Sequence, residues 1–356
     1  MKSVSALKVG CGKFFHGAGV IHLLPREILR LGGKAFILGG PTSMKLFLQT
    51  AAADLKKAGV TYFSRIHTEH CTAAWAAQYA SLVRQENCTV LIGVGGGKCL
   101  DLMKCVSTLT GLPIITIPTS IATCAATSMV CIMYNEKGQR APAVKLEKEV
   151  DVCIADTDLI ASAPPRTLAA GILDSMAKMP ECFHQKDISS YRDCPFTEYM
   201  QTINSRAIYD FLSGEARELY FKGRASSRFE DAILIHLLCT SIVSGFADGS
   251  GQLALAHATY DFMRNHNTEN SCRFLHGEIV GTGLLIQMIY NRMEQQAIEH
   301  YKALLHDLDS PCSLKEIGYP CSPEKIDFFV KTIALDANVP QGEPMERLRS
   351  AVALAL

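Results

Sequence analysis

Apolar and polar residues follow two different patterns along the chain, and the change falls near residue 160. In the first part, short apolar or β-branched runs are separated by longer stretches with helical periodicity. Continuous apolar runs are typical of strands that are buried on both faces, as in a parallel sheet covered by helices. The predicted strands are 34–40, 60–66, 89–97, 112–119 and 150–157, with predicted helices at 42–59 and 72–85.

The second part is predicted to be helical. Pro164 and Pro165 interrupt the chain, and proline is favoured at the first position of a helix. Strand-like alternation is almost absent beyond them. We therefore expect an α/β domain over 1–160 and an all-helical domain over 161–356. The predicted helices are 166–184, 198–222, 228–248, 251–264, 277–306 and 323–335, with loops at 186–197 and 307–324.

Composition narrows the classes of partner. The 356 residues contain 35 Lys plus Arg and 35 Asp plus Glu, so no basic excess favours nucleic acid or a membrane surface. The 14 cysteines form no CxxC pair and often lie in apolar runs, which indicates reduced, buried thiols in a cytoplasmic protein. Neither a signal peptide nor a run of about 18 apolar residues is found, so no membrane helix is expected. Small molecules and other subunits remain as partners.

Four glycines and a lysine mark the carboxyl end of one predicted strand. They are Gly93, Gly95, Gly96, Gly97 and Lys98. Glycines allow the backbone to approach a phosphate, and the following helix offers free N–H groups and the positive end of its dipole. The spacing matches neither the Walker A loop nor GxGxxG. A tight turn without a ligand is the alternative, but this density of glycines favours a phosphate loop.

Three candidate metal ligands lie in apolar helical sequence. Asp174 is unfavourable inside a helix, and its charge is costly to bury without a partner. Lys178 lies one helical turn further on, so an ion pair between Asp174 and Lys178 is the alternative to a metal ligand. His257 and His276 would each, taken singly, be read as core residues. Together the three residues predict a carboxylate–His–His site for zinc or another divalent ion, with an open fourth position.

Several longer blocks carry a family resemblance. In chain order they are IGVGGGKCLDLMK, IPTSIATCAATSMVCIMYNEKGQ, ADTDLIASAPPRTLAAGILDSMAK, LALAHAT and FLHGEIVGTG. The chain resembles the glycerol dehydrogenase branch of the iron-containing alcohol dehydrogenase superfamily over nearly its whole length. The resemblance implies a Rossmann-like first domain, a helical metal-binding second domain, a nicotinamide cofactor and a homo-oligomer.

The resemblance also implies roles for individual residues. Asp174, His257 and His276 match the zinc ligands of these relatives. Lys178 stands where iron-type relatives have a fourth ligand, a histidine, and this favours zinc. The cofactor positions implied are Gly95, Gly96, Gly97, Lys98, Asp101, Thr119, Ser128, Val130 and Tyr134.

Cys124 departs from glycerol dehydrogenases, which carry an aspartate that contacts glycerol at this position. A thiol cannot accept two polyol hydroxyls as a carboxylate does, and the loss of a negative charge favours an anionic substrate. The block ATCAA resembles hydroxycarboxylate dehydrogenases, which reduce 2-oxo acids. Lys178 is then a candidate partner for the substrate carboxylate, and pairing with Asp174 or another acid is an equal alternative.

A second departure concerns the cofactor. Gly39 and Gly40 end the predicted strand 34–40, at the place where an acidic residue would bind the ribose 2′-hydroxyl of NAD. Without that acid, nothing repels a 2′-phosphate, so we expect NADP to be used at least as well as NAD.

The sequence thus predicts a metal-dependent, NAD(P)-linked oxidoreductase acting on CH–OH groups, with a small 2-oxo acid or other carbonyl compound as substrate. An NAD-dependent glycerol dehydrogenase is the first alternative. A nucleotide-binding protein without catalysis is the second, since Cys124 and Tyr260 both depart from relatives. A dehydroquinate synthase-like lyase or a glycerol-1-phosphate dehydrogenase ranks lower, because only Lys178, Arg264 and Arg273 offer positive charge near the predicted ligands.

Overall fold

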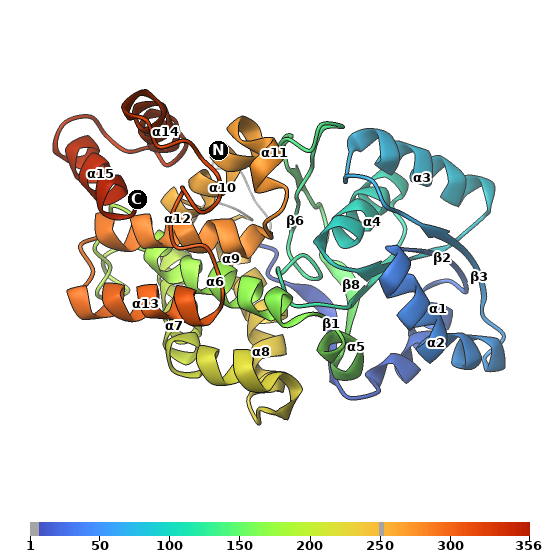
Figure 1. Ribbon diagram of the computed structural model, residues 1–356. Coiled ribbons are helices and arrows are strands. Elements are labelled where there is room, and N and C mark those ends of the chain that lie inside the picture. Colours follow the sequence, from blue (N-terminus) through green and yellow to red (C-terminus); the bar gives the residue numbers. More distant parts are fainter. Residues whose placement is uncertain (1–6, 249–252) are drawn as a thin grey trace. The chain divides into compact units, whose positions relative to one another are not determined.

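The computed structural model describes residues 7–248 and 253–356 (Figure 1). These residues form two compact units. The first contains the described residues up to Pro164 and a segment that begins at Ser227, and the second contains Pro165–Ser226 and the C-terminal part of the chain. The sequence placed one boundary near residue 160 and did not assign the segment after Ser227 to the first unit.

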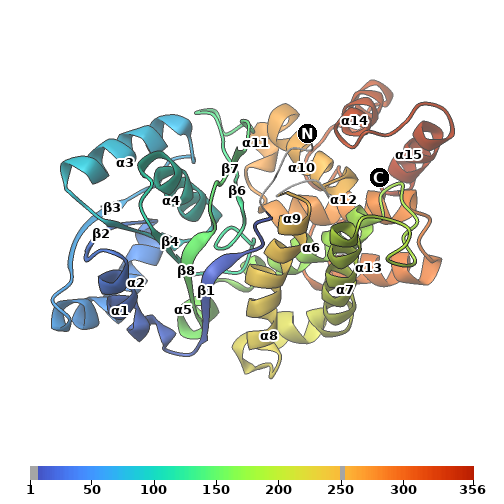
Figure 2. The same ribbon diagram turned by 180° about the vertical axis from the view of Figure 1, so that it is seen from behind.

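The first unit is built on a parallel sheet of six strands (Figure 2). Their order is β1-β8-β5-β4-β2-β3, and every neighbouring pair is parallel. The strands are β1 (Cys11–Gly17), β2 (Lys34–Gly39), β3 (Thr61–Ile66), β4 (Val90–Gly95), β5 (Ile114–Pro118) and β8 (Val150–Asp156), and a separate antiparallel pair comprises β6 (Val130–Cys131) and β7 (Val144–Lys145). The α/β fold is confirmed. The strand β1 was not among the predicted strands; none of its residues is fully buried, so it lacks the continuous apolar run of the central strands.

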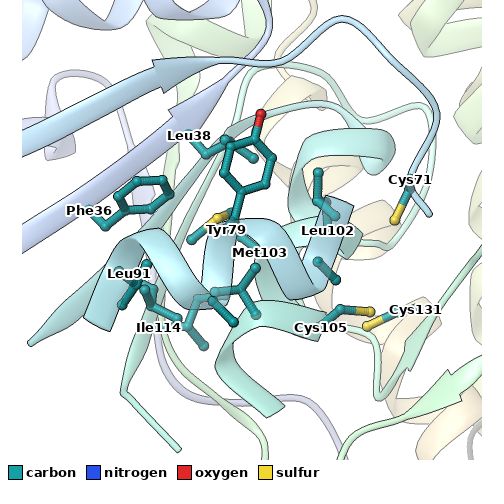
Figure 3. Close-up of a cluster of buried hydrophobic side chains, with 14 of the residues drawn as sticks. Phe36, Leu38, Cys71, Tyr79, Leu91, Leu102, Met103, Cys105, Ile114 and Cys131 are labelled. Carbon is teal, nitrogen blue, oxygen red and sulfur yellow. The ribbon is translucent and has the colours of Figure 1, made fainter. Parts of the chain in front are cut away.

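Helices cover both faces of this sheet. They are α1 (Leu24–Leu31), α2 (Pro41–Lys57), α3 (Ala73–Gln85), α4 (Gly97–Thr110) and α5 (Thr157–Ala161). On one face, α3 and α4 pack on Phe36, Leu38 and Leu91, and Figure 3 shows part of this core. On the other face, α1 and α2 pack on alternate residues of the same strands, such as Ile37 and Ile92. This double coverage explains why the strands read as continuous apolar runs.

The strand order reverses direction between β2 and β4. From β2 the chain crosses to β3 on one side, and from β4 it crosses to β5 on the other. Gly39 is paired with Val94, so the carboxyl ends of the two central strands lie next to each other. Open α/β sheets bind ligands at such a switch point. The turn Gly39–Gly40 and the glycines Gly95–Gly97 are therefore neighbours at the position expected for a dinucleotide.

The second unit is helical, as predicted. Its helices are α6 (Pro165–Cys182), α7 (Phe196–Lys222), α10 (Leu255–His266), α11 (Thr268–Ser271), α12 (His276–Tyr290), α13 (Gln295–Asp307), α14 (Pro323–Asp336) and α15 (Glu343–Leu354). The single helix predicted over 277–306 is two helices, since the chain turns at Arg292, whose φ is 56°. The last helix, α15, was not predicted.

Glycines set the close packing of α12 against its neighbours. A Cβ at Gly277 would lie 1.7 Å from the carbonyl oxygen of Ala170 on α6, and a Cβ at Gly283 would lie 2.7 Å from that of Ala256 on α10. Only a residue without a side chain allows the backbones to approach so closely. The run HGEIVGTG therefore brings three helices of this unit together near the start of α12.

The segment after Ser227 contains α8 (Phe229–Leu234), a π-helical stretch (Ile235–Cys239) and α9 (Thr240–Phe246). The stretch Phe229–Phe246 is apolar enough to cross a membrane by length and composition, with a mean hydropathy of 1.4. The sequence reading, based on uninterrupted apolar runs, expected no such segment. In the structure 56% of the stretch is buried inside the protein, which is also typical of a core helix.

Candidate metal centre and phosphate loop

Asp174, His257 and His276 converge in the second unit. Asp174 comes from the middle of α6, His257 from the first turn of α10, and His276 from the first residue of α12. Asp174 Oδ1 lies 3.3 Å from His257 Nε2 and 3.4 Å from His276 Nε2. One ligand atom from each residue lies within 4.8 Å of the others. The tertiary structure thus joins residues that the sequence separates by many positions.

The spacing of these atoms suits a divalent cation. Zinc ligands at about 2.0–2.1 Å in a tetrahedron lie roughly 3.3–3.4 Å apart, which is the separation of the carboxylate and imidazole atoms here. Asp174 Oδ1 is buried and accepts no hydrogen bond within the described residues. A buried carboxylate oxygen without a hydrogen-bond donor is costly unless a cation satisfies it. The residues present therefore fit a metal ion.

Glu181 orients His257, and the sequence reading missed this residue. Its Oε2 lies 2.6 Å from His257 Nδ1, and its Oε1 accepts hydrogen bonds from the backbone N–H groups of Ala254 and His257. The carboxylate both caps α10 and fixes the imidazole so that Nε2 points toward Asp174. Asp174, Lys178 and Glu181 follow the spacing i, i+4, i+7 along α6. This spacing could have identified Glu181 from the sequence, since it places all three residues on one face of the helix.

A second carboxylate positions His276. Glu278 accepts a hydrogen bond from the backbone N–H of Leu275 at 2.7 Å, which caps α12. Arg166 on α6 holds the same carboxylate with two hydrogen bonds, of 2.5 and 2.7 Å. The start of α12, and with it His276, is therefore tied to the helix that carries Asp174.

The charges around Asp174 favour a bound cation. Burial raises the pKa of Asp174, but Lys178 and His276 outweigh it and hold the pKa well below its usual value, so the group is a carboxylate. Burial lowers the pKa of His276, which keeps its imidazole neutral. For His257, burial lowers the pKa, but the carboxylates of Glu181 and Asp174 raise it overall. A metal cation bound at Nε2 of His257 would take the place of the proton that the carboxylates of Glu181 and Asp174 stabilise there.

Lys178 lies beside the ligand set. Its ammonium is 3.8 Å from Asp174 Oδ1 and 3.4 Å from His257 Nε2, and the side chain is buried. The structure thus shows the ion pair that the sequence offered as one alternative. The same position, next to the three ligands, is also compatible with an approach to a substrate carboxylate.

The phosphate loop has the backbone geometry that the glycines predicted. Gly95 has a φ of +132°, where a side chain would be strained, and its Cβ would meet Ser43 Oγ at 3.0 Å. Gly96 is the N-cap of α4 without a side-chain cap, so the N–H groups of Gly97 and Lys98 face outward from the start of the helix, whereas that of Cys99 is bonded to the carbonyl oxygen of Gly96. Thr119 donates its backbone N–H to the carbonyl of Gly95. An anion would meet donors and the positive helix end here.

Asp101 and Ser128, by contrast, belong to a buried network around Lys104. The Lys104 ammonium lies 2.9 Å from Asp101 Oδ1 and donates to Ser128 Oγ and to the carbonyl oxygens of Ser128 and Val130. Asp101 Oδ2 accepts the backbone N–H of Ile132. These contacts fix the segment that leads through β6 to Tyr134. The contacts of Asp101, Ser128, Val130 and Tyr134 with a cofactor stay predictions.

Cys124 lies in the turn before Ser128 and is half-buried. Its carbonyl oxygen accepts the backbone N–H groups of Thr127 and Ser128 and the hydroxyl of Ser241. The backbone of this turn is therefore fixed, whichever side chain stands at the position. The role of the thiol in substrate binding remains a prediction.

The other residues weighed near the metal centre have structural contacts. The Tyr260 ring lies against His276 at a centroid distance of 4.2 Å. Arg264 donates to the carbonyl oxygens of Ser271 and Phe274, and Arg273 donates to Asn270. The two arginines thus shape the loop before α12. Because both guanidinium groups already donate hydrogen bonds within the protein, they are less suited to binding a phosphate ester substrate in this unit.

Comparison with known proteins agrees with the geometry. Residues 11–157 match the family model of iron-containing alcohol dehydrogenases. The glycerol dehydrogenase of Thermotoga maritima is 28% identical over 312 residues, which are 86% of this chain and 83% of that protein. Hydroxycarboxylate dehydrogenase A of Escherichia coli is 30% identical over 222 residues, 61% of this chain and 60% of that protein. The structure of a probable glycerol dehydrogenase from Sinorhizobium meliloti has a TM-score of 0.82 at 22% identity, covering 99% and 98% of the two chains.

Proposed function

Because residues 11–157 match the family model of iron-containing alcohol dehydrogenases and the whole chain has the fold of glycerol dehydrogenase structures, we propose that it is a metal-dependent oxidoreductase that transfers a hydride between NAD(P) and a small 2-oxo acid or its hydroxy form. The observation that carries this proposal is the convergence of Asp174, His257 and His276 on one buried point. The nucleotide-binding protein without catalysis, considered as an alternative, has no need of such a ligand set.

In the proposed mechanism the second unit supplies the metal centre. A divalent ion such as Zn²⁺, held by Asp174, His257 and His276, would supply Lewis-acid polarisation of the substrate oxygen. Glu181 keeps the imidazole of His257 in the tautomer that leaves Nε2 without a proton. The burial of Asp174 and Lys178 excludes bulk water and strengthens their interactions with a charged substrate.

The first unit would bind the cofactor. The glycines Gly95, Gly96 and Gly97, with Lys98, would bind the phosphates at the start of α4. The hydride chemistry belongs to the nicotinamide. Gly39 and Gly40 leave no acidic side chain in the neighbouring turn, so we expect NADPH to support initial rates at least comparable to those with NADH.

Cys124 and Lys178 support a 2-oxo acid as the substrate. Cys124 removes the negative charge that glycerol dehydrogenases are expected to carry in this turn. Lys178 adds a buried ammonium beside the metal ligands. The partial match to hydroxycarboxylate dehydrogenase A also supports a 2-oxo acid as the substrate.

Glycerol is the second candidate substrate. Proteins named glycerol dehydrogenase from Thermotoga maritima, Citrobacter freundii and Pseudomonas putida all match over most of this chain. A soluble cytoplasmic homo-oligomer without nucleic-acid or membrane partners is the form that we propose for the protein in either case.

The first test links the metal to turnover. We expect His257→Ala to lose both zinc, measured by elemental analysis after dialysis, and turnover of the best substrate. His300→Ala, at an exposed position on α13, is the matched control and should keep both. Undiminished activity in a metal-free His257→Ala enzyme would contradict the mechanism.

The second test decides between the two substrates. Initial rates are measured for 2-oxo acids, polyols and aldehydes with both cofactors. We expect pyruvate-sized 2-oxo acids to be reduced faster than glycerol is oxidised, and Cys124→Asp to shift the ratio of kcat/KM values toward glycerol. A panel in which glycerol is preferred at neutral and alkaline pH would favour the second candidate.

A further inference from the structure

Four sulfur atoms gather in the core of the first unit. They belong to Cys71, which precedes α3, to Cys105 on α4, to Cys131 in β6 and to Met133, which follows that strand. All four side chains are buried, with at most 4% exposed. Figure 3 shows the three cysteines at one end of the core between α3, α4 and the sheet. None of these four residues belongs to the phosphate loop or to the metal centre described above.

The contacts place Cys105 at the centre of this sulfur cluster, which we define as Cys71, Cys105, Cys131 and Met133. The thiols of Cys105 and Cys71 point at Met133 Sδ, at 3.3 and 3.5 Å. The Cys105 thiol is also in hydrogen-bond contact with the thiols of Cys131 and Cys71. Sulfur atoms from two other chain segments, one with Cys71 and one with Cys131 and Met133, therefore contact the thiol of Cys105 on α4.

The charges nearest the sulfur cluster are those of the ion pair between Lys104 and Asp101. Binding of a monovalent cation by two thiols releases two protons and leaves a unit with one negative charge. The buried ammonium of Lys104 interacts electrostatically with Cys131 and favours its thiolate, while the carboxylate of Asp101, with which Lys104 is paired, acts in the opposite sense. The contact with Cys131 lowers the pKa of the Cys105 thiol, but the contact with Cys71 and burial outweigh it and raise this pKa to about 12, so Cys105 is protonated in the absence of a metal.

The geometry points to a second metal site: the sulfur cluster binds one soft monovalent cation, Cu⁺. Thiolates and a thioether are the donors that Cu⁺ prefers, whereas carboxylate and imidazole suit harder divalent ions. Cys105 supplies the central thiolate, Cys131 or Cys71 the second, and Met133 the neutral sulfur. No electron is transferred: two S–H bonds break, three S–Cu bonds form, one of them to the neutral thioether, and two protons leave to solvent.

The test is an anaerobic titration of the reduced protein with Cu⁺ in competition with bicinchoninate. Accessible thiols, such as the exposed Cys272 and Cys321, are first capped with iodoacetamide under native conditions. We expect one Cu⁺ to be retained per chain, with about two protons released and a sulfur-only first shell in X-ray absorption. Cys105→Ala should weaken retention at least tenfold. Cys88→Ala, in the same core but outside the sulfur cluster, is the matched control and should leave retention unchanged.

Two further variants separate the possible outcomes. Met133→Leu conserves volume, so it tests the thioether even if Cys105→Ala fails to fold; we expect several-fold weaker retention. His257→Ala should not affect Cu⁺ retention, because its imidazole lies in the other unit. Equal loss of Cu⁺ from wild type, Cys105→Ala and Met133→Leu, or nitrogen in the first shell, would show that the sulfur cluster is ordinary core packing.

Discussion

The two units each bury an aspartate on a helix with a lysine close behind it, yet the two pairs differ. Asp101 and Lys104 are 2.9 Å apart, and Lys104 is fully buried. Asp174 and Lys178 are also buried, but their charged atoms are 3.8 Å apart. Two imidazole nitrogens lie closer to Asp174 than its lysine does.

The difference separates a structural ion pair from a binding site. Lys104 makes further hydrogen bonds to Ser128 and Val130, so its donors are satisfied within the first unit. Burial raises the pKa of Asp101 overall, while that of Asp174 is held well below its usual value. The surroundings of Asp174 therefore favour its charged form, whereas burial dominates at Asp101. A carboxylate that is charged, buried and not saturated by donors is suited to a metal ion.

The largest expected effect tests the Asp174 side of the comparison. Asp174→Asn removes the anionic ligand and should lower turnover by at least ~10³-fold, since Lewis-acid stabilisation amounts to several kcal/mol and each ~1.36 kcal/mol is tenfold. Zinc content should fall with it. Asp101→Asn should retain zinc. The interpretation of the metal centre fails if the two variants bind zinc equally well.

The Asp101 side is tested through stability. Lys104→Met leaves Asp101 buried without its cation and should lower the free energy of unfolding by about 3–5 kcal/mol, measured by urea denaturation. Lys178→Met, measured with zinc present, should cost much less, because the metal then neutralises Asp174. If both lysine variants destabilise the protein equally in zinc, the proposed distinction between the pairs is lost.

A smaller effect is expected from the residue that orients His257. Glu181→Gln keeps the shape of the side chain but weakens the hold on Nδ1, and should reduce zinc affinity by about 10–100-fold. The affinity is read by competition with a chelating dye. Glu198→Gln, whose carboxylate pairs with Lys186 near the start of α7, serves as the control and should not change zinc affinity.

The smallest effect concerns Ser128. Its hydroxyl accepts from Lys104 and donates to the carbonyl of Val130, so Ser128→Ala should cost about 0.5–1.5 kcal/mol of stability. We expect the KM for NADPH to change by less than about threefold. A large rise in KM with unchanged stability would instead make Ser128 a direct cofactor contact.

The sequence by itself determined the alternation of buried strands and helices and the change to a helical second part. It also determined the glycine loop before α4, because glycines at a strand end are a local signal. The local pattern alone could not separate Asp101 from Asp174, since each is an aspartate with a lysine one turn away; the family resemblance assigned Asp174 to the metal and Asp101 to the cofactor. Nor could it include the segment after Ser227 in the first unit.

Only the tertiary structure decided which aspartate is surrounded by imidazoles. Gly277 and Gly283 allow α12 to approach α6 and α10, and this approach brings His276 within 3.4 Å of Asp174. Glu181 acts on His257 only because α10 begins beside the end of α6. Helical periodicity reports which residues share a face of one helix, whereas a ligand set depends on the distance between helices, and that distance is fixed by packing.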